Sequence, residues 1–74
     1  MTTQQLDCKG MRCPMPIVQL AMAIRKLAIG DELEVEATDP AFLPDAQAWS
    51  RMTGNELCET IDGAIKKVRV RRLK

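Results

Sequence analysis

Two closely spaced prolines in Cys13-Pro14-Met15-Pro16 constrain this chain more than any other feature, because they fix where a helix begins. Proline is tolerated in the first turn of a helix, since the N–H groups there have no intrahelical acceptor. The helix is therefore expected to begin at Pro14, or at Pro16 if the second proline keeps Met15 out of the helical conformation. Either start places Cys13 at the positive end of the helix dipole.

A cysteine in this position is predicted to be nucleophilic. The partial positive charge at a helix N-terminus stabilises a thiolate, and Lys9 and Arg12 add positive charge nearby, so we expect a lowered pKa for Cys13. Backbone N–H groups of the first turn are expected to stabilise a terminal sulfur anion, although Pro14 and Pro16 remove two donors.

Hydrophobic periodicity divides the rest of the chain into four alternating segments and two helical ones. Gly10 and Gly30 end the first strand and the first helix, and Asp62-Gly63 predicts a tight turn between the last two strands. The expected strands are residues 4–9, 32–38, 57–61 and 65–70. The expected helices are residues 14–30 and 43–54.

The order βαβαββ predicts an α/β two-layer sandwich in which two helices cover one face of a mixed four-stranded sheet. The other face of the sheet is expected to meet solvent. Acidic positions on the second strand and basic positions on the last are expected to form cross-strand pairs. No second domain, repeat or linker is evident, so residues 1–74 are predicted to form one domain.

A chain of 74 residues has room for only a modest core, which favours a surface site and a carrier over an enzyme with a deep cleft. No apolar run approaches the length of a membrane span, and residues 1–5 do not resemble a signal peptide. We therefore expect a cytoplasmic protein without a membrane partner.

Three cysteines and no histidine limit the chemistry that the chain can assemble. No Cys-x-x-Cys pair occurs and no histidine completes a ligand set, so no metal site is predicted. Cys8 and Cys58 fall in expected strands and are predicted to pack, although Cys8 is also an alternative resolving thiol for Cys13. Trp49 and Met11 are expected in the core.

The last nine residues, 66–74, hold six lysines or arginines. The simplest interpretation is a solvated strand whose charges discourage edge-to-edge aggregation. The alternatives are docking to an acidic protein surface or to nucleic acid. Phe42 and Trp49 are the only aromatic side chains, so direct nucleic-acid binding is not favoured.

Residues 6–16, Leu-Asp-Cys-Lys-Gly-Met-Arg-Cys-Pro-Met-Pro, resemble the signature of the TusA-like sulfur-carrier family. Thr38-Asp39-Pro40, Asp45 and residues 48–57 extend the likeness over essentially the whole chain. The sequence departs from the commonest family pattern at Ala46, where a branched apolar residue is expected, and in a last strand without aromatics.

The resemblance implies that Cys13 accepts sulfane sulfur as a persulfide and passes it on. It implies a sulfurtransferase-like carrier rather than a conventional enzyme, with no cofactor beyond the transient sulfur. Gly10, Arg12, Pro14 and Pro16 are expected to support this site. Lys9, Met15 and Asp45 are candidate partner contacts.

The resemblance also implies a class of partners. The expected donor is a cysteine desulfurase or rhodanese-like protein, and the expected acceptor is DsrE/TusD-like or DsrC/TusE-like. The pathways served by the family are transfer RNA thiolation, molybdenum-cofactor synthesis and dissimilatory sulfur oxidation. Two other functions stay open from the residues: a regulatory or nucleic-acid-binding module that uses the basic last strand, and a thiol redox protein that pairs Cys8 with Cys13.

Overall fold

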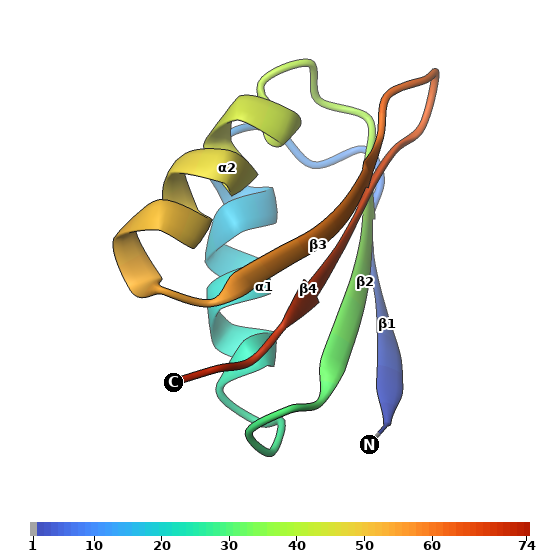
Figure 1. The fold of residues 1–74 in the computed structure, drawn as a ribbon. Helices are drawn as coiled ribbons and strands as arrows, with labels where there is room; N and C mark the ends of the chain where they lie inside the picture. The colour runs from blue at the N-terminus through green and yellow to red at the C-terminus, as the bar shows by residue number, and fades with distance from the viewer. Residues whose placement is uncertain (1) are drawn as a thin grey trace.

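Four strands form one mixed sheet, and both helices cover the same face of it (Figure 1). A computed structural model describes residues 2–74. The elements in chain order are β1 (Thr3–Cys8), α1 (Met15–Ile24), β2 (Glu32–Ala37), α2 (Phe42–Thr53), β3 (Glu56–Ile61) and β4 (Lys66–Arg71). The predicted βαβαββ order and two-layer sandwich are therefore confirmed.

The strand order is β1-β2-β4-β3, so β2 separates the first strand from the last. β1 and β2 are parallel, whereas β4 runs antiparallel to both of its neighbours, β2 and β3. One row across the sheet contains Thr3, Glu32 and Arg71, and the row at the opposite end contains Cys8, Ala37 and Lys66. The loops that follow β1 and β2 therefore both leave the sheet at the end where Cys8 and Ala37 lie, opposite the end with Thr3 and Arg71.

The core lies between the sheet and the two helices. Alternation on β2 turns its apolar side chains toward the helices, and Trp49 of α2 is buried as predicted. Met11 also packs against this core, in agreement with the prediction. The buried apolar residues are Cys8, Leu20, Ile24, Leu27, Leu33, Val35, Ala37, Phe42, Ala46, Trp49, Val68 and Val70.

Helix α1 is shorter than its periodicity predicts. It ends at Ile24 rather than near Gly30, because the chain tightens into i→i+3 hydrogen bonds from Lys26 and Leu27. The guanidinium of Arg72 then donates to the backbone carbonyls of Arg25 and Leu27. These bonds satisfy carbonyls that a longer helix would have used itself.

The connection between β3 and β4 also differs from the prediction. The predicted hairpin of the last two strands is confirmed, but its connection is longer than Asp62-Gly63, because residues 62–65 all lie outside the strands and Ile65 is exposed rather than part of β4. The register of β3 shifts between Leu57 and Glu59, so Cys58 is the extra residue of a β-bulge.

The basic last strand is interior rather than at an edge. β4 is hydrogen-bonded to a strand on each side. The interpretation that its charges discourage edge-to-edge aggregation is therefore wrong. The predicted cross-strand pairs are present on the outer, helix-free face. Glu32 contacts Arg69 at 3.1 Å and Arg71 at 2.7 Å, and Arg71 also contacts Glu56 at 3.1 Å.

Within residues 2–74, neither helix has the length and apolar character that crossing a membrane requires.

Candidate functional site

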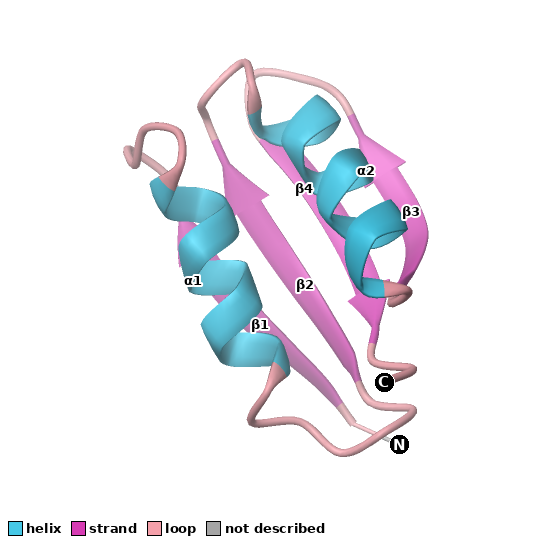
Figure 2. Cartoon of the chain, turned by 90° about the vertical axis from the view of Figure 1, so that its left-hand side faces the viewer, coloured by secondary structure: helices cyan, strands magenta, loops and turns pink. Residues whose placement is uncertain are grey.

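The loop that joins β1 to α1 carries Cys13 and is fastened to the loop that joins β2 to α2. Gly10, with a φ of 84°, donates its N–H to Thr38 Oγ1 at 3.0 Å. The Cys13 N–H donates to Asp39 Oδ2 at 2.7 Å. Figure 2 shows these two loops at the same end of the molecule, above the carboxyl ends of β1 and β2. Open α/β sheets commonly bind their ligands at this edge.

Cys13 lies at the surface and contacts two aspartates, one through its backbone and one through its thiol. Its Sγ donates a hydrogen bond to Asp45 Oδ2 at 3.1 Å. Asp45 is half-buried in the first turn of α2, and Asp39 precedes that helix. Asp39 is held in place by the N–H groups of Cys13 and Ala41, so its position is tied to both loops.

The predicted lowering of the Cys13 pKa is wrong for this arrangement. The hydrogen bond to Asp45 raises the pKa of the Cys13 thiol, and partial burial and the charges of Asp45 and Asp39 act in the same direction. The thiol is therefore held as a proton donor.

The backbone donors predicted to stabilise a sulfur anion already have acceptors. Met15 N–H donates to the carbonyl of Arg12 at 2.8 Å, and the N–H groups of Ile17 and Val18 both donate to Pro14 at 3.1 Å. The helix begins at Met15, between the two predicted starts, with Pro14 as its N-cap. The expectation of anion binding by the first turn is therefore not met in this conformation.

The two prolines of the motif have different surroundings. Pro16 is fully buried and helps to anchor the start of α1 to the core. Pro14 is exposed, follows a cis peptide bond from Cys13 and lines the groove beside the thiol. Met15 between them is 44% exposed, so its side chain is accessible for the partner contact that the sequence predicts.

A shallow apolar groove of about 290 Å³ lies on the Asp45 side of the thiol, between the start of α1 and α2. Met52 at its rim is 86% exposed. The groove is lined by Cys13, Pro14, Ile17, Asp45, Ala48, Trp49 and Met52. A second hollow of about 420 Å³ is lined by Gly10, Met11, Arg12, Cys13, Thr38, Asp39 and Pro40. Cys13 thus borders two separate hollows.

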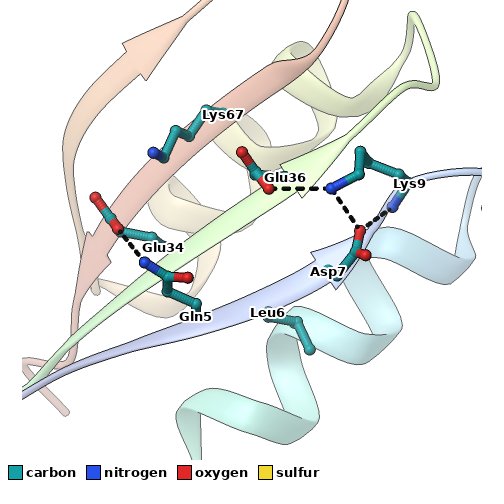
Figure 3. Close-up of a pocket in the computed structure, with 7 residues that line it drawn as sticks. All are labelled: Gln5, Leu6, Asp7, Lys9, Glu34, Glu36 and Lys67. Atoms are coloured by element: carbon teal, nitrogen blue, oxygen red, sulfur yellow. Dashed lines mark hydrogen bonds and ion pairs between the residues drawn. The ribbon is translucent and has the colours of Figure 1, made fainter.

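Lys9 does not belong to this site. Figure 3 shows its side chain on the outer sheet face, where Nζ lies 3.2 Å from Glu36 Oε1 and 3.3 Å from Asp7 Oδ1. Lys9, Asp7 and Glu36 line a hollow of about 400 Å³ on this face. Its other lining residues are Gln5, Leu6, Glu34 and Lys67, and none of the residues that line it is a cysteine. Lys9 therefore does not supply the positive charge that the sequence predicted near Cys13.

The other two cysteines occupy different environments. Cys8 is completely buried in the core, as predicted, and Cys58 is half-buried at the β-bulge. Burial raises the pKa of both thiols. All three cysteines are free, and Cys13 is the exposed one.

Sequence reasoning named Asp45 as a partner contact and did not give Asp39 a role at the site. The structure places Asp45 against the Cys13 thiol and Asp39 against the Cys13 backbone. An available signal for Asp39 was its position before Pro40 at the entrance to a helix, where aspartate commonly accepts backbone hydrogen bonds. No local spacing rule connects Cys13 with Asp45.

Comparison with known proteins identifies the family of this chain. The family profile described as "Sulfurtransferase TusA" matches residues 4–72. The chain is 47% identical over 57 residues to the "Putative sulfur carrier protein YrkI" of Bacillus subtilis, covering 77% of this chain and 76% of that protein. It is 40% identical over 57 residues to the "Sulfur carrier protein TusA" of Allochromatium vinosum, covering 77% and 75%. A protein of the same name from Pseudomonas putida is 37% identical over 59 residues, covering 80% and 74%. The chain therefore belongs to the TusA sulfurtransferase family.

Proposed function

We propose that this protein is a sulfur carrier that holds sulfane sulfur as a persulfide on Cys13. The observation that carries the proposal is the exposed Cys13 thiol on a fastened loop, in a chain whose Cys8 is buried and whose Cys58 is half-buried. The relatives named as sulfur carriers support the same role. Gly10, Pro14 and Pro16 support it structurally, through the turn, the groove and the core contact.

The chemistry is an exchange of sulfur between thiols in two steps. First, Cys13 loses its proton and attacks the outer sulfur of a donor persulfide. The donor S–S bond breaks, its inner sulfur leaves as a thiolate that takes up a proton, and Cys13 becomes a persulfide. Second, an acceptor thiolate attacks the outer sulfur on Cys13, and Sγ leaves as the restored thiolate.

The open surroundings of Cys13 support transfer between proteins rather than binding of a small substrate. Its two shallow hollows do not enclose the thiol, and Met15 and Met52 are exposed beside it. Methionine adapts its shape to different partners. We assign the donor to the cysteine desulfurase or rhodanese-like class and the acceptor to the DsrE/TusD-like or DsrC/TusE-like class. The exchange belongs in a reducing cytoplasm and serves transfer RNA thiolation, molybdenum-cofactor synthesis or sulfur oxidation.

The basic last strand gives little support to a nucleic-acid-binding module. Arg69 and Arg71 are already paired with glutamates on the outer face. A redox pair of Cys8 and Cys13 is equally poorly supported, because Cys8 is completely buried.

Intact-protein mass spectrometry after incubation with a cysteine desulfurase and cysteine tests the proposal. We expect a mass gain of one sulfur atom that is lost in Cys13→Ser and retained in the matched control Cys58→Ser. A protein that gains no sulfur from this donor or from a rhodanese-like donor, while a control acceptor is loaded, would contradict it.

A further inference from the structure

Asp45 is the one side chain that hydrogen-bonds to the Cys13 thiol within residues 2–74. Its Oδ2 lies 3.1 Å from Sγ, and α2 holds it in a groove whose other walls are apolar side chains. Apolar surroundings screen a charge less than water does. The charge of Asp45 therefore acts directly on whatever the sulfur carries.

We propose that Asp45 is a positioning residue that distinguishes the empty carrier from the loaded one. It accepts a hydrogen bond from the Cys13 thiol, and it repels the persulfide anion that replaces this thiol. The inference rests on the proposed function, because only a sulfur carrier alternates between these two states.

The two states differ in the group that faces the carboxylate. The empty carrier presents an S–H, which donates to Oδ2. After loading, Sγ bears a second sulfur in place of its proton, and that terminal sulfur is more acidic than a thiol. Near neutral pH it is an anion. A favourable contact thus becomes a like-charge contact.

The other charged groups around Cys13 do not reverse this effect. Asp39, from the loop before α2, also disfavours an anion at Cys13. Arg12 lines the second hollow, which Asp39 also lines, and is not among the residues of the apolar groove. The first turn of α1 is uncharged. Repulsion by Asp45 therefore disfavours a terminal sulfur anion beside its carboxylate, in the apolar groove that Asp45 lines.

The contact also affects the direction of transfer. In the exchange between a donor persulfide and the Cys13 thiol, Asp45 stabilises the empty carrier and destabilises the loaded one. The equilibrium constant for loading is lowered as a result. The same destabilisation makes the loaded carrier a stronger sulfur donor to the next thiol.

The test is the loading equilibrium of the full chain in mixtures of glutathione persulfide and glutathione. The loaded fraction at Cys13 is measured by mass spectrometry of the intact protein and located by peptide mapping. Asp45→Asn removes the charge at nearly constant shape, and Asp45→Glu keeps it. Asp62→Asn, in the exposed connection between β3 and β4, makes the same chemical change elsewhere. Cys13→Ser sets the background.

We expect Asp45→Asn to raise the loading constant at least about fivefold near neutral pH, because fivefold is the effect of one charge about 4 Å away in water and apolar surroundings strengthen it. The increase should narrow as the pH falls and the persulfide becomes protonated. Asp45→Glu should stay closer to the unaltered protein, and Asp62→Asn should match it. A merely structural role for Asp45 would not produce this dependence on charge and pH.

Equal loading constants for the unaltered protein and Asp45→Asn at every pH would overturn the inference while leaving the proposed function intact. Failure of the unaltered Cys13 to take up sulfur would instead overturn the proposed function and the inference with it. Circular dichroism checks the fold of each variant. If Asp45→Asn unfolds, Asp45→Ser is tested against the same expectation.

Discussion

The outer sheet face and the Cys13 edge of the molecule use charge in opposite ways. On the outer face, Glu32 lies between Arg69 and Arg71, so acidic and basic groups neutralise one another. At the Cys13 edge, Asp39 and Asp45 flank a thiol, and none of the ion pairs formed within residues 2–74 includes either of them. The paired charges stabilise the sheet, whereas the unpaired charges of Asp39 and Asp45 lie beside the sulfur whose protonation state changes.

Removing one acidic side chain from each region should give the largest difference in the free energy of unfolding. Asp39→Ala deprives the N–H groups of Cys13 and Ala41 of their acceptor, so we expect a loss of about 1 to 2 kcal/mol in the free energy of unfolding. Glu34→Ala, which removes an exposed contact with Gln5, should cost less than about 0.5 kcal/mol. Urea denaturation measures both, and equal losses would contradict the distinction between the two regions.

Low pH should remove the stability that the ion pairs of the outer face contribute. Hydrogen bonds from Arg71 and Arg69 lower the pKa of Glu32 below its ordinary value. A lowered folded-state pKa gives stability that is present above the unfolded pKa and is lost as the pH falls through the folded one.

We therefore expect Glu32→Gln to have a lower Tm than the unaltered protein at neutral pH. The difference should disappear at a pH below the folded-state pKa of Glu32. Thermal unfolding followed by circular dichroism at several pH values measures this, and a Tm difference that persists unchanged in acid would argue against ionisation of Glu32 as its source.

The exposed methionine beside the thiol should affect transfer but not loading capacity. Met15→Ala removes apolar contact area that is accessible to a partner, so we expect transfer to an acceptor protein to slow by roughly threefold to tenfold. The extent of sulfur loading on Cys13 should not change. Single-turnover transfer followed by mass spectrometry separates the two quantities, and an unaltered transfer rate would remove Met15 from the partner contact.

The smallest effect is expected from the basic strand. Since Arg69 and Arg71 are paired internally, Lys67→Ala should change the association rate with a donor by less than about twofold. Raising the salt concentration from about 0.05 to 0.5 M should have a similarly small effect. Stopped-flow binding measures both, and a steep salt dependence would restore the basic strand as a docking surface.

Short-range patterns predicted most of the fold. Alternation on β2 and helical spacing on α2 located these elements, because each pattern reports which side chains face one core. The end of α1 was missed, because it depends on Arg72, which lies far along the chain from the carbonyls of Arg25 and Leu27. The bulge at Cys58 was missed for a similar reason, since it is a property of strand pairing.

The candidate site shows the same division. Cys13 was identified because its motif is contiguous, but its protonation depends on Asp45, 32 residues away in sequence. Local reasoning counted the charges of Lys9 and Arg12 and the helix dipole. The structure turns Lys9 to the outer face and brings a carboxylate to the sulfur instead. The sequence therefore predicted the reactive atom and missed the group that controls it.

The row that contains Thr3 and Arg71 lies at the opposite end of the sheet from Cys8 and the loop that bears the thiol. Strands of six residues separate these ends by roughly 17 to 20 Å. A tag, a surface anchor or a fused domain joined to either terminus would emerge away from Cys13. The fold can therefore be joined to another protein through either terminus while the end of the molecule that bears Cys13 stays accessible for sulfur exchange.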